Sequence, residues 1–299
     1  MGFLDKLKAG GDATIGVSLE PGDVTPGAEV VLRVDVGGDI DDKCRAVRAG
    51  ITCTGHYLVK ERDRDADGDV DVDEVWRTVD IHEEAHEFPV AVGPLQAHFT
   101  VPPGAQPSSE DAVEWTAWAR IDREKGRDVV ERLPLGVRFG PDTMPAERPG
   151  DPSNEGLTLL DVPAAVRAGE PLTGTLGVSL ADDAKVTAVR IRLHRRRTYV
   201  ADTIEGVGVS GGQSLVADLF LGGGASRIVK DDEVTEVDLA GKRSFEPGQS
   251  ERLEFSVAVP AEAGPSTTHQ HGQVDWRVEA VLDRRMRGDL SVEAPVVVF

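Results

Sequence analysis

The most distinctive cluster of chemically capable residues in this chain is the acidic segment 63–74, DRDADGDVDVDE. Its alternating carboxylates, with a glycine at position 68, match the spacing of an EF-hand calcium loop. Carboxylate oxygens at this spacing suit a hard cation such as Ca²⁺, and the glycine permits the sharp turn that wraps them around it. The sequence therefore predicts a candidate calcium site whose ligands are Asp63, Asp65, Asp67, Asp69, Asp71 and Glu74.

The residues that flank this segment leave a second interpretation open. Both 56–60 (HYLVK) and 75–81 (VWRTVDI) have the composition of strands. An EF-hand supplies its last carboxylate from the start of a helix, so a strand context weakens the case for Glu74 as a ligand. The alternative is a solvated acidic hairpin tip, which is the usual role of a run of like charges.

A second charged pattern consists of four basic residues at alternating positions, which a strand would place on one face. This ridge could bind an anionic partner, such as a phosphorylated segment or the acidic tip of another copy. The alternative is neutralisation by Asp and Glu side chains on neighbouring strands. The candidate partner-binding residues are Arg190, Arg192, His194 and Arg196.

Three short strings resemble catalytic or metal-binding motifs without the context that the chemistry requires. The zinc-peptidase string at 82–86 (HEEAH) needs a helix, whereas Pro89 and the alternation after it predict a hairpin turn entering a strand. The serine-hydrolase string at 208–212 (GVSGG) needs a strand before it and a helix after it. The pair His269 and His271 is expected in a polar loop. We therefore expect no enzymatic activity, with a zinc peptidase or a serine hydrolase as remote alternatives.

The elements that must position these residues are strands throughout. Apolar residues alternate with polar ones in 14–20, 29–36, 45–60, 172–180 and 189–193. A period of two is typical of strands that are buried on one side. Turn signals rich in Pro and Gly separate these stretches, and no long segment has a helical period. The predicted fold class is all-β.

The two halves of the chain repeat each other. Segment 113–123 (VEWTAWARIDR) aligns without gaps with 274–284 (VDWRVEAVLDR), so that Trp115 matches Trp276. Upstream, Val24 matches Val166, and Phe99 is expected to match Phe255. A duplicated unit of this size predicts two tandem β-sandwiches.

This repeat sets the predicted domain limits. A short amphipathic segment occupies residues 1–13, and the first sandwich follows at 14–139. A proline-rich linker covers 140–156, and the second sandwich covers 157–299. The glycine-rich stretch 207–228 within the second half is either a partner site or a mobile loop.

Charge and cysteine content limit the classes of partner. The formal net charge of −20 argues against nucleic acid as a partner and allows at most peripheral membrane association. Cys44 and Cys53 lie nine residues apart on one expected strand, too far for a disulfide. Free thiols fit a reducing compartment, and no apolar stretch is long enough to span a membrane, so a cytoplasmic location is expected.

The order of these features resembles a known family. The chain has an amphipathic start, strand entries reading PGAEV and AGEPLTG, strands that end in proline, and closing hairpins reading VEWTAWARID and VDWRVEAVLDRR. Together they resemble the arrestin-like pattern, and most of all the bacterial sporulation-control proteins of the stage 0 sporulation protein M group. The resemblance covers nearly the whole chain and contains no catalytic signature.

The resemblance implies two arrestin-like, immunoglobulin-like β-sandwich domains without enzymatic activity. It implies a regulatory or adaptor task in bacterial sporulation or development, carried out by binding a protein partner. The partner is not named by the sequence, and unpaired sandwich edges make a homo-oligomer possible. A calcium-responsive binding module that uses segment 63–74 is the alternative function.

Calorimetric titration with Ca²⁺ tests that alternative. The calcium hypothesis predicts that the wild-type chain binds the cation and that the double variant Asp63→Ala/Asp65→Ala loses binding, because two of the ligating carboxylates are removed. Absence of wild-type binding at millimolar Ca²⁺ would reject it and leave the solvated acidic tip.

Overall fold

The described part of the chain is built of strands. The computed structural model describes residues 13–38, 40, 43–64, 70–124, 126–140, 151–201, 226–284 and 287–299. These residues contain no helix, and the all-β prediction is confirmed. None of them therefore forms a helix that is long and apolar enough to cross a membrane.

The chain forms two compact units. The first comprises Met1–His56 and Arg77–Gly140, and the second comprises Tyr57–Trp76 and Pro141–Phe299. This division differs from the predicted limits, which assigned 57–76 to the first sandwich. These residues group with the second unit because Leu58 is buried in a cluster with Tyr199 and Ile228.

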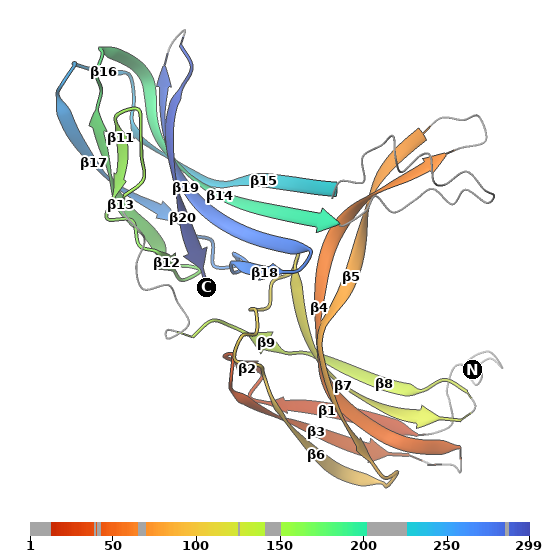
Figure 1. Cartoon of the computed structure of the whole chain (residues 1–299). Helices are drawn as coiled ribbons and strands as arrows, with labels where there is room; N and C mark the ends of the chain where they lie inside the picture. Colours follow the sequence, from red (N-terminus) through yellow and green to blue (C-terminus); the bar gives the residue numbers. More distant parts are fainter. Residues whose placement is uncertain are drawn as a thin grey trace, which may run out of the picture. The chain divides into compact units, whose positions relative to one another are not determined.

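The first unit consists of two main sheets that face each other (Figure 1). One sheet has the order β1-β3-β6 and the other the order β5-β4-β7-β8, while β2 and β9 form a short parallel pair. The two longest strands, β4 and β5, also supply residues 57–64 and 70–76 of the second unit. The strands are β1 (Thr14–Glu20), β2 (Asp23–Val24), β3 (Glu29–Gly37), β4 (Cys44–Arg64), β5 (Val70–Phe88), β6 (Gly93–Thr100), β7 (Val113–Arg123), β8 (Val129–Pro134) and β9 (Gly136–Val137).

The predicted alternation explains the core of this unit. Successive side chains of a strand point to opposite sides of its sheet, so every second residue can be buried. On β3, Val30, Leu32 and Val34 are fully buried, and on β4 the same holds for Val47 and Ile51. The intervening residues of these strands are left to form the outer faces of the sheets.

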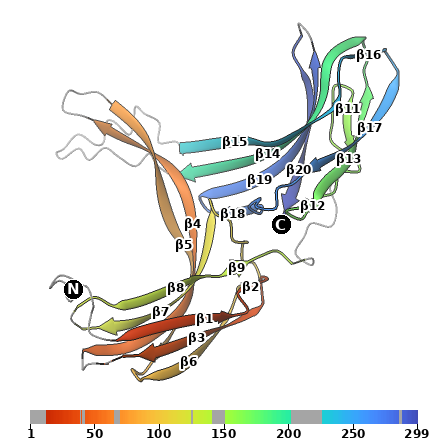
Figure 2. The same ribbon diagram turned by 180° about the vertical axis from the view of Figure 1, so that it is seen from behind.

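The second unit also has two facing sheets (Figure 2). One has the order β10-β11-β13-β17, and the other has the order β12-β20-β19-β14-β15 with β16 and β18 attached. Its first strand, β10, pairs with β11, so this sheet begins inside the predicted linker; residues 141–150 lie outside the described residues. The strands are β10 (Ser153–Asn154), β11 (Leu157–Leu160), β12 (Ala165–Val166), β13 (Pro171–Ser179), β14 (Ala184–Ala201), β15 (Ser226–Ala240), β16 (Arg243–Phe245), β17 (Ser250–Ala258), β18 (Thr267–His269), β19 (Gly272–Arg284) and β20 (Leu290–Val298).

The matched tryptophans hold equivalent positions in the two units. Trp115 is buried on β7, and its indole Nε1 donates a hydrogen bond to the backbone oxygen of Gln106 at 3.0 Å. Trp276 is buried on β19, and its Nε1 donates to the backbone oxygen of Gly264 at 2.9 Å. A buried indole N–H needs such an acceptor, and both units provide it from the loop that precedes the strand.

The two units also start in the same way. Val24 pairs with Val137 in a short parallel ladder, and Val166 pairs with Val298 in another. The glycines three residues after these valines, Gly27 and Gly169, both have φ of 86°, a conformation that favours glycine. The structure thus repeats the local geometry that the sequence repeat predicts.

One detail of the predicted alignment is wrong. Phe99 lies opposite Val30, whereas Phe255 lies opposite Gly174. The shift of 142 residues that relates Val24 to Val166 carries Val30 onto Leu172, which pairs with Val257. Phe99, the partner of Val30, therefore corresponds to Val257 and not to Phe255. A shared Phe followed by small residues was a weaker guide than the strand register.

The two cysteines are free thiols on β4, as the strand argument predicts. Cys53 is 1% exposed, and burial raises the pKa of its thiol to about 12. Cys44 is partly exposed. Only the thiolate is an effective nucleophile, so burial should make Cys53 inert.

Alkylation with iodoacetamide at pH 8 measures this difference. We expect Cys44 to react in the native protein and Cys53 to react only after denaturation, because its pKa lies far above the reaction pH. Mass spectrometry of the digested protein identifies each site. Equal labelling of both thiols in the native state would contradict the burial of Cys53.

Candidate functional site

The outer face of the sheet that contains β14 is covered by ion pairs. Arg190 contacts Asp283 at 2.8 Å and Asp238 at 3.0 Å, and Arg192 contacts Glu236 at 2.7 Å. The hydrogen bond that Arg190 donates to Asp238, together with nearby carboxylates, raises the pKa of Arg190 above its ordinary value. These carboxylates come from β15 and β19, the strands on either side of the predicted basic ridge.

The remaining residues of the ridge lie in the same network. The Nε2 atom of His194 is 3.2 Å from a carboxylate oxygen of Glu279. Arg196 lies between Asp231 of β15 and Asp275 of β19 in the strand register. The contacts of the ridge therefore favour the neutralisation alternative over an exposed surface for an anionic partner.

The equivalent face of the first unit carries a different set of side chains. Gly50 pairs with Trp118 in the first unit at the register position where Arg192 pairs with Glu279 in the second. Similarly, Thr116 of the first unit corresponds to Arg277 of the second. At these positions a glycine, a threonine and one aromatic ring therefore replace long charged side chains of the second unit.

The Trp118 ring packs directly against position 50, which must be a small residue. A Cβ at Gly50 would approach the Trp118 ring to 2.7 Å and the backbone oxygen of Glu84 to the same distance. The indole Nε1 donates a hydrogen bond to Oγ1 of Thr52 at 2.8 Å, which fixes the plane of the ring. The guanidinium carbon of Arg120 lies 5.6 Å from the ring centroid, within the range of a cation–π contact.

Beside this ring the outer face forms an open groove with a volume of about 460 Å³. Threonines from β4 and β7 and the Trp118 ring line it together with acidic residues and two arginines. The lining residues are Thr52, Thr54, Asp80, Glu83, Glu114, Thr116, Trp118, Arg120, Val130 and Arg132.

Only some of the charged side chains in the groove form ion pairs. Arg120 contacts Asp122 at 2.5 Å, and Asp122 also contacts Arg48 at 3.1 Å. Asp80 and Glu83 are exposed and form no ion pair with any described residue. The groove therefore offers uncompensated carboxylates beside a flat aromatic surface and hydroxyl groups.

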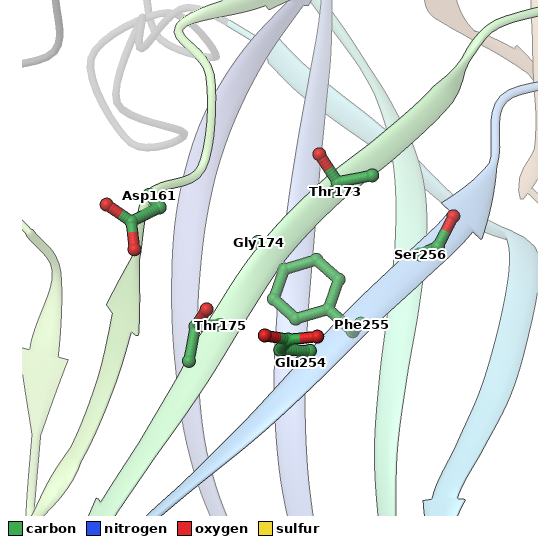
Figure 3. A pocket seen from close by; sticks show the side chains of 7 residues that line it. All are labelled: Asp161, Thr173, Gly174, Thr175, Glu254, Phe255 and Ser256. Atoms are coloured by element: carbon green, nitrogen blue, oxygen red, sulfur yellow. The ribbon is translucent and has the colours of Figure 1, made fainter.

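A second hollow, in the second unit, has a volume of about 520 Å³ and lies along β13 and β17 (Figure 3). The ring of Phe255 packs against Gly174, where a Cβ would meet the ring at 2.6 Å. Phe255 is 5% exposed and belongs to the main core of this unit. Its ring is core packing, so this hollow lacks an exposed aromatic surface and is the weaker candidate.

The predicted calcium segment is described only in part. The residues Asp65, Asp67 and Asp69 lie outside the described residues, and of Asp63 only the strand backbone is described. Asp71 is exposed on β5. Glu74, the expected closing ligand, instead contacts Nζ of Lys230 at 2.5 Å. Within the described ranges no three or more His, Cys, Asp or Glu residues are grouped as metal ligands, and calcium binding stays a prediction.

The expected turn at 82–86 is wrong, because β5 continues without interruption from Val70 to Phe88. The histidines of the zinc-peptidase string therefore lie on a strand and not on the helix that this motif requires. The rings of His82 and Trp115 are 5.8 Å apart, and those of His86 and Phe99 are 4.9 Å apart. Both histidines pack along the edge of the first core.

The serine-hydrolase string and the pair His269 and His271 are the two remaining motifs predicted from the sequence. The serine-hydrolase string at 208–212 lies outside the described residues. His269 ends strand β18, and His271 follows in the tight turn to β19. The Nδ1 atom of His271 is 3.1 Å from the backbone oxygen of Val200, which is consistent with a structural role.

Comparison with known proteins does not identify this chain. No protein-family model matches it, and no curated protein matches it at a significant level. The groove is therefore described by its own chemistry. Sequence reasoning missed it, although a glycine inside β4 and a tryptophan on the polar side of β7 were the available signals.

Replacing Gly50 by Ala should displace the Trp118 ring. The added methyl would also press on the backbone of β5, so we expect a loss of about 1 to 3 kcal/mol in the free energy of unfolding. Urea denaturation measures the loss, and tryptophan fluorescence reports the displaced ring. Gly241→Ala is the matched control, because nothing lies within 4 Å of a Cβ at that position. Equal stability of the two variants would contradict the close packing at Gly50.

Proposed function

We propose that this chain is a non-enzymatic adaptor of arrestin type that binds a protein partner through the groove beside Trp118. The observation that carries the proposal is the difference between the two repeated units. On the second unit ion pairs cover Arg190 and Arg192, whereas on the first unit the position of Arg192 is Gly50 and a groove lies beside Trp118. A position at which the two repeats differ in this way is a candidate for a specialised role.

The chemistry of the groove suits a polypeptide. Tryptophan and arginine are the residues most enriched at the energetic centres of protein interfaces, and the groove has both in Trp118, Arg120 and Arg132. The threonine hydroxyls can donate and accept hydrogen bonds, which suits the alternating N–H and C=O groups of an extended chain. The open shape supports a segment that lies along the surface.

The sequence resemblance supports the biological setting of the proposal, which is regulation in bacterial sporulation or development within the cytoplasm. The proposal assigns no catalytic residue and no cofactor. It is consistent with the strand context of His82 and His86, since the peptidase motif that they resemble requires a helix.

Affinity capture from the cells that make the protein tests the proposal. The tagged full chain should retain a specific protein, and Trp118→Ala should retain about tenfold less of it, because a central aromatic anchor is removed. Circular dichroism and urea denaturation show whether the variant is folded.

Arg192→Gln serves as the matched control, because it changes the equivalent face of the second unit. It should retain the partner like the wild type. Undiminished capture by Trp118→Ala together with loss of capture by Arg192→Gln would assign binding to the second unit and overturn the proposal.

A further inference from the structure

Strand β5 forms one edge of its sheet in the first unit. The strand order is β5-β4-β7-β8, and among the described residues no strand pairs with the outer side of β5. Residues 78–88 therefore present main-chain N–H and C=O groups that have no strand partner on that side among the described residues. An edge of this kind can accept an additional strand from another protein.

Lysine and proline, which often protect a sheet edge, are missing from this stretch, so its protection against pairing comes from its acidic side chains. Proteins commonly block exposed edges with lysine, proline or a covering element. Residues 77–88 (RTVDIHEEAHEF) contain neither lysine nor proline. In addition, Ile81 is 43% exposed, which leaves an apolar side chain on the edge for a partner to cover.

The charge of the edge selects the partner. Four carboxylates and one arginine lie in residues 77–88. Glu87 is already bound to Arg48 at 2.9 Å, whereas Asp80 and Glu83 are exposed and form no ion pair with the described residues. A strand that carries Lys or Arg side chains would place them opposite these carboxylates, where opposite charges stabilise a strand pair.

The same charges act against self-association at this edge. Pairing of β5 with β5 of a second copy would bring carboxylates together in a chain whose formal net charge is −20. Like charges on paired strands are destabilising. The acidic edge thus disfavours pairing with a second copy and favours a basic strand.

We infer that the β5 edge at residues 77–88 is a docking site for an extended basic segment of a partner protein, which adds to the sheet as a further strand. The inference rests on the proposed adaptor function and names the kind of segment that the partner supplies. Because Asp80 and Glu83 also line the groove, a segment bound along β5 lies next to Trp118.

Three labelled synthetic peptides of equal length test the inference by fluorescence anisotropy with the full chain. They contain alternating Lys and Val, alternating Lys and Gly, or alternating Glu and Val. The Lys–Val peptide should bind about tenfold more tightly than the Lys–Gly peptide, because glycine disfavours a strand, and the Glu–Val peptide should not bind. Hydrogen exchange should show that the Lys–Val peptide protects amides within residues 77–88.

Variants locate the site. Ile81→Lys/Glu83→Lys should weaken Lys–Val binding about tenfold by removing an apolar contact and reversing a charge. The matched variant Val129→Lys/Glu131→Lys, which changes β8 at the opposite edge of the same sheet, should bind like the wild type. Circular dichroism verifies that both variants are folded.

Two results would overturn the inference: equal affinity for the two lysine peptides, which indicates charge attraction alone, or binding that Ile81→Lys/Glu83→Lys leaves unchanged. These results are separable from a failure of the adaptor proposal. If Trp118→Ala loses the captured partner but the wild-type chain does not bind the Lys–Val peptide, the adaptor proposal stands and docking at the β5 edge is rejected.

Discussion

The two-residue alternation of buried and outward side chains, in two pairs of long antiparallel strands, is the constraint on which this structure depends. The pair β4 and β7 builds the first unit, and the pair β14 and β19 builds the second. On the inner side both pairs must supply apolar residues and one buried tryptophan, Trp115 or Trp276. The outer side is free of this requirement, and the two units differ there: Arg192 pairs with Glu279 in the second unit where Gly50 pairs with Trp118 in the first.

Much of the fold was predictable because the signals are local and repeated. The alternation in 14–20 and 29–36 corresponds to β1 and β3, and the paired tryptophans lie in equivalent environments. The prediction failed at 82–86, where Pro89 suggested a nearby turn. There, pairing along β4 extends β5 up to Phe88. Sheet pairing of this kind outweighs a local turn preference.

The candidate site was harder to predict, because it depends on which residues meet across strands. Gly50 and Trp118 are distant in sequence, and only the register of β4 with β7 shows that one accommodates the other. The same holds for the ridge, where the alternation of Arg190 and Arg192 was visible in the sequence. The carboxylates that neutralise them come from β15 and β19, whose register the sequence did not specify.

We propose that the first unit binds the partner with the outer face beside Trp118. Hydrogen exchange of the full chain, with and without its captured partner, tests it most directly. Binding at this face should bring new protection within residues 77–88 and 114–120, on β5 and β7. Protection confined to residues 190–197 and 275–279, on the ion-paired face of the second unit, would contradict it.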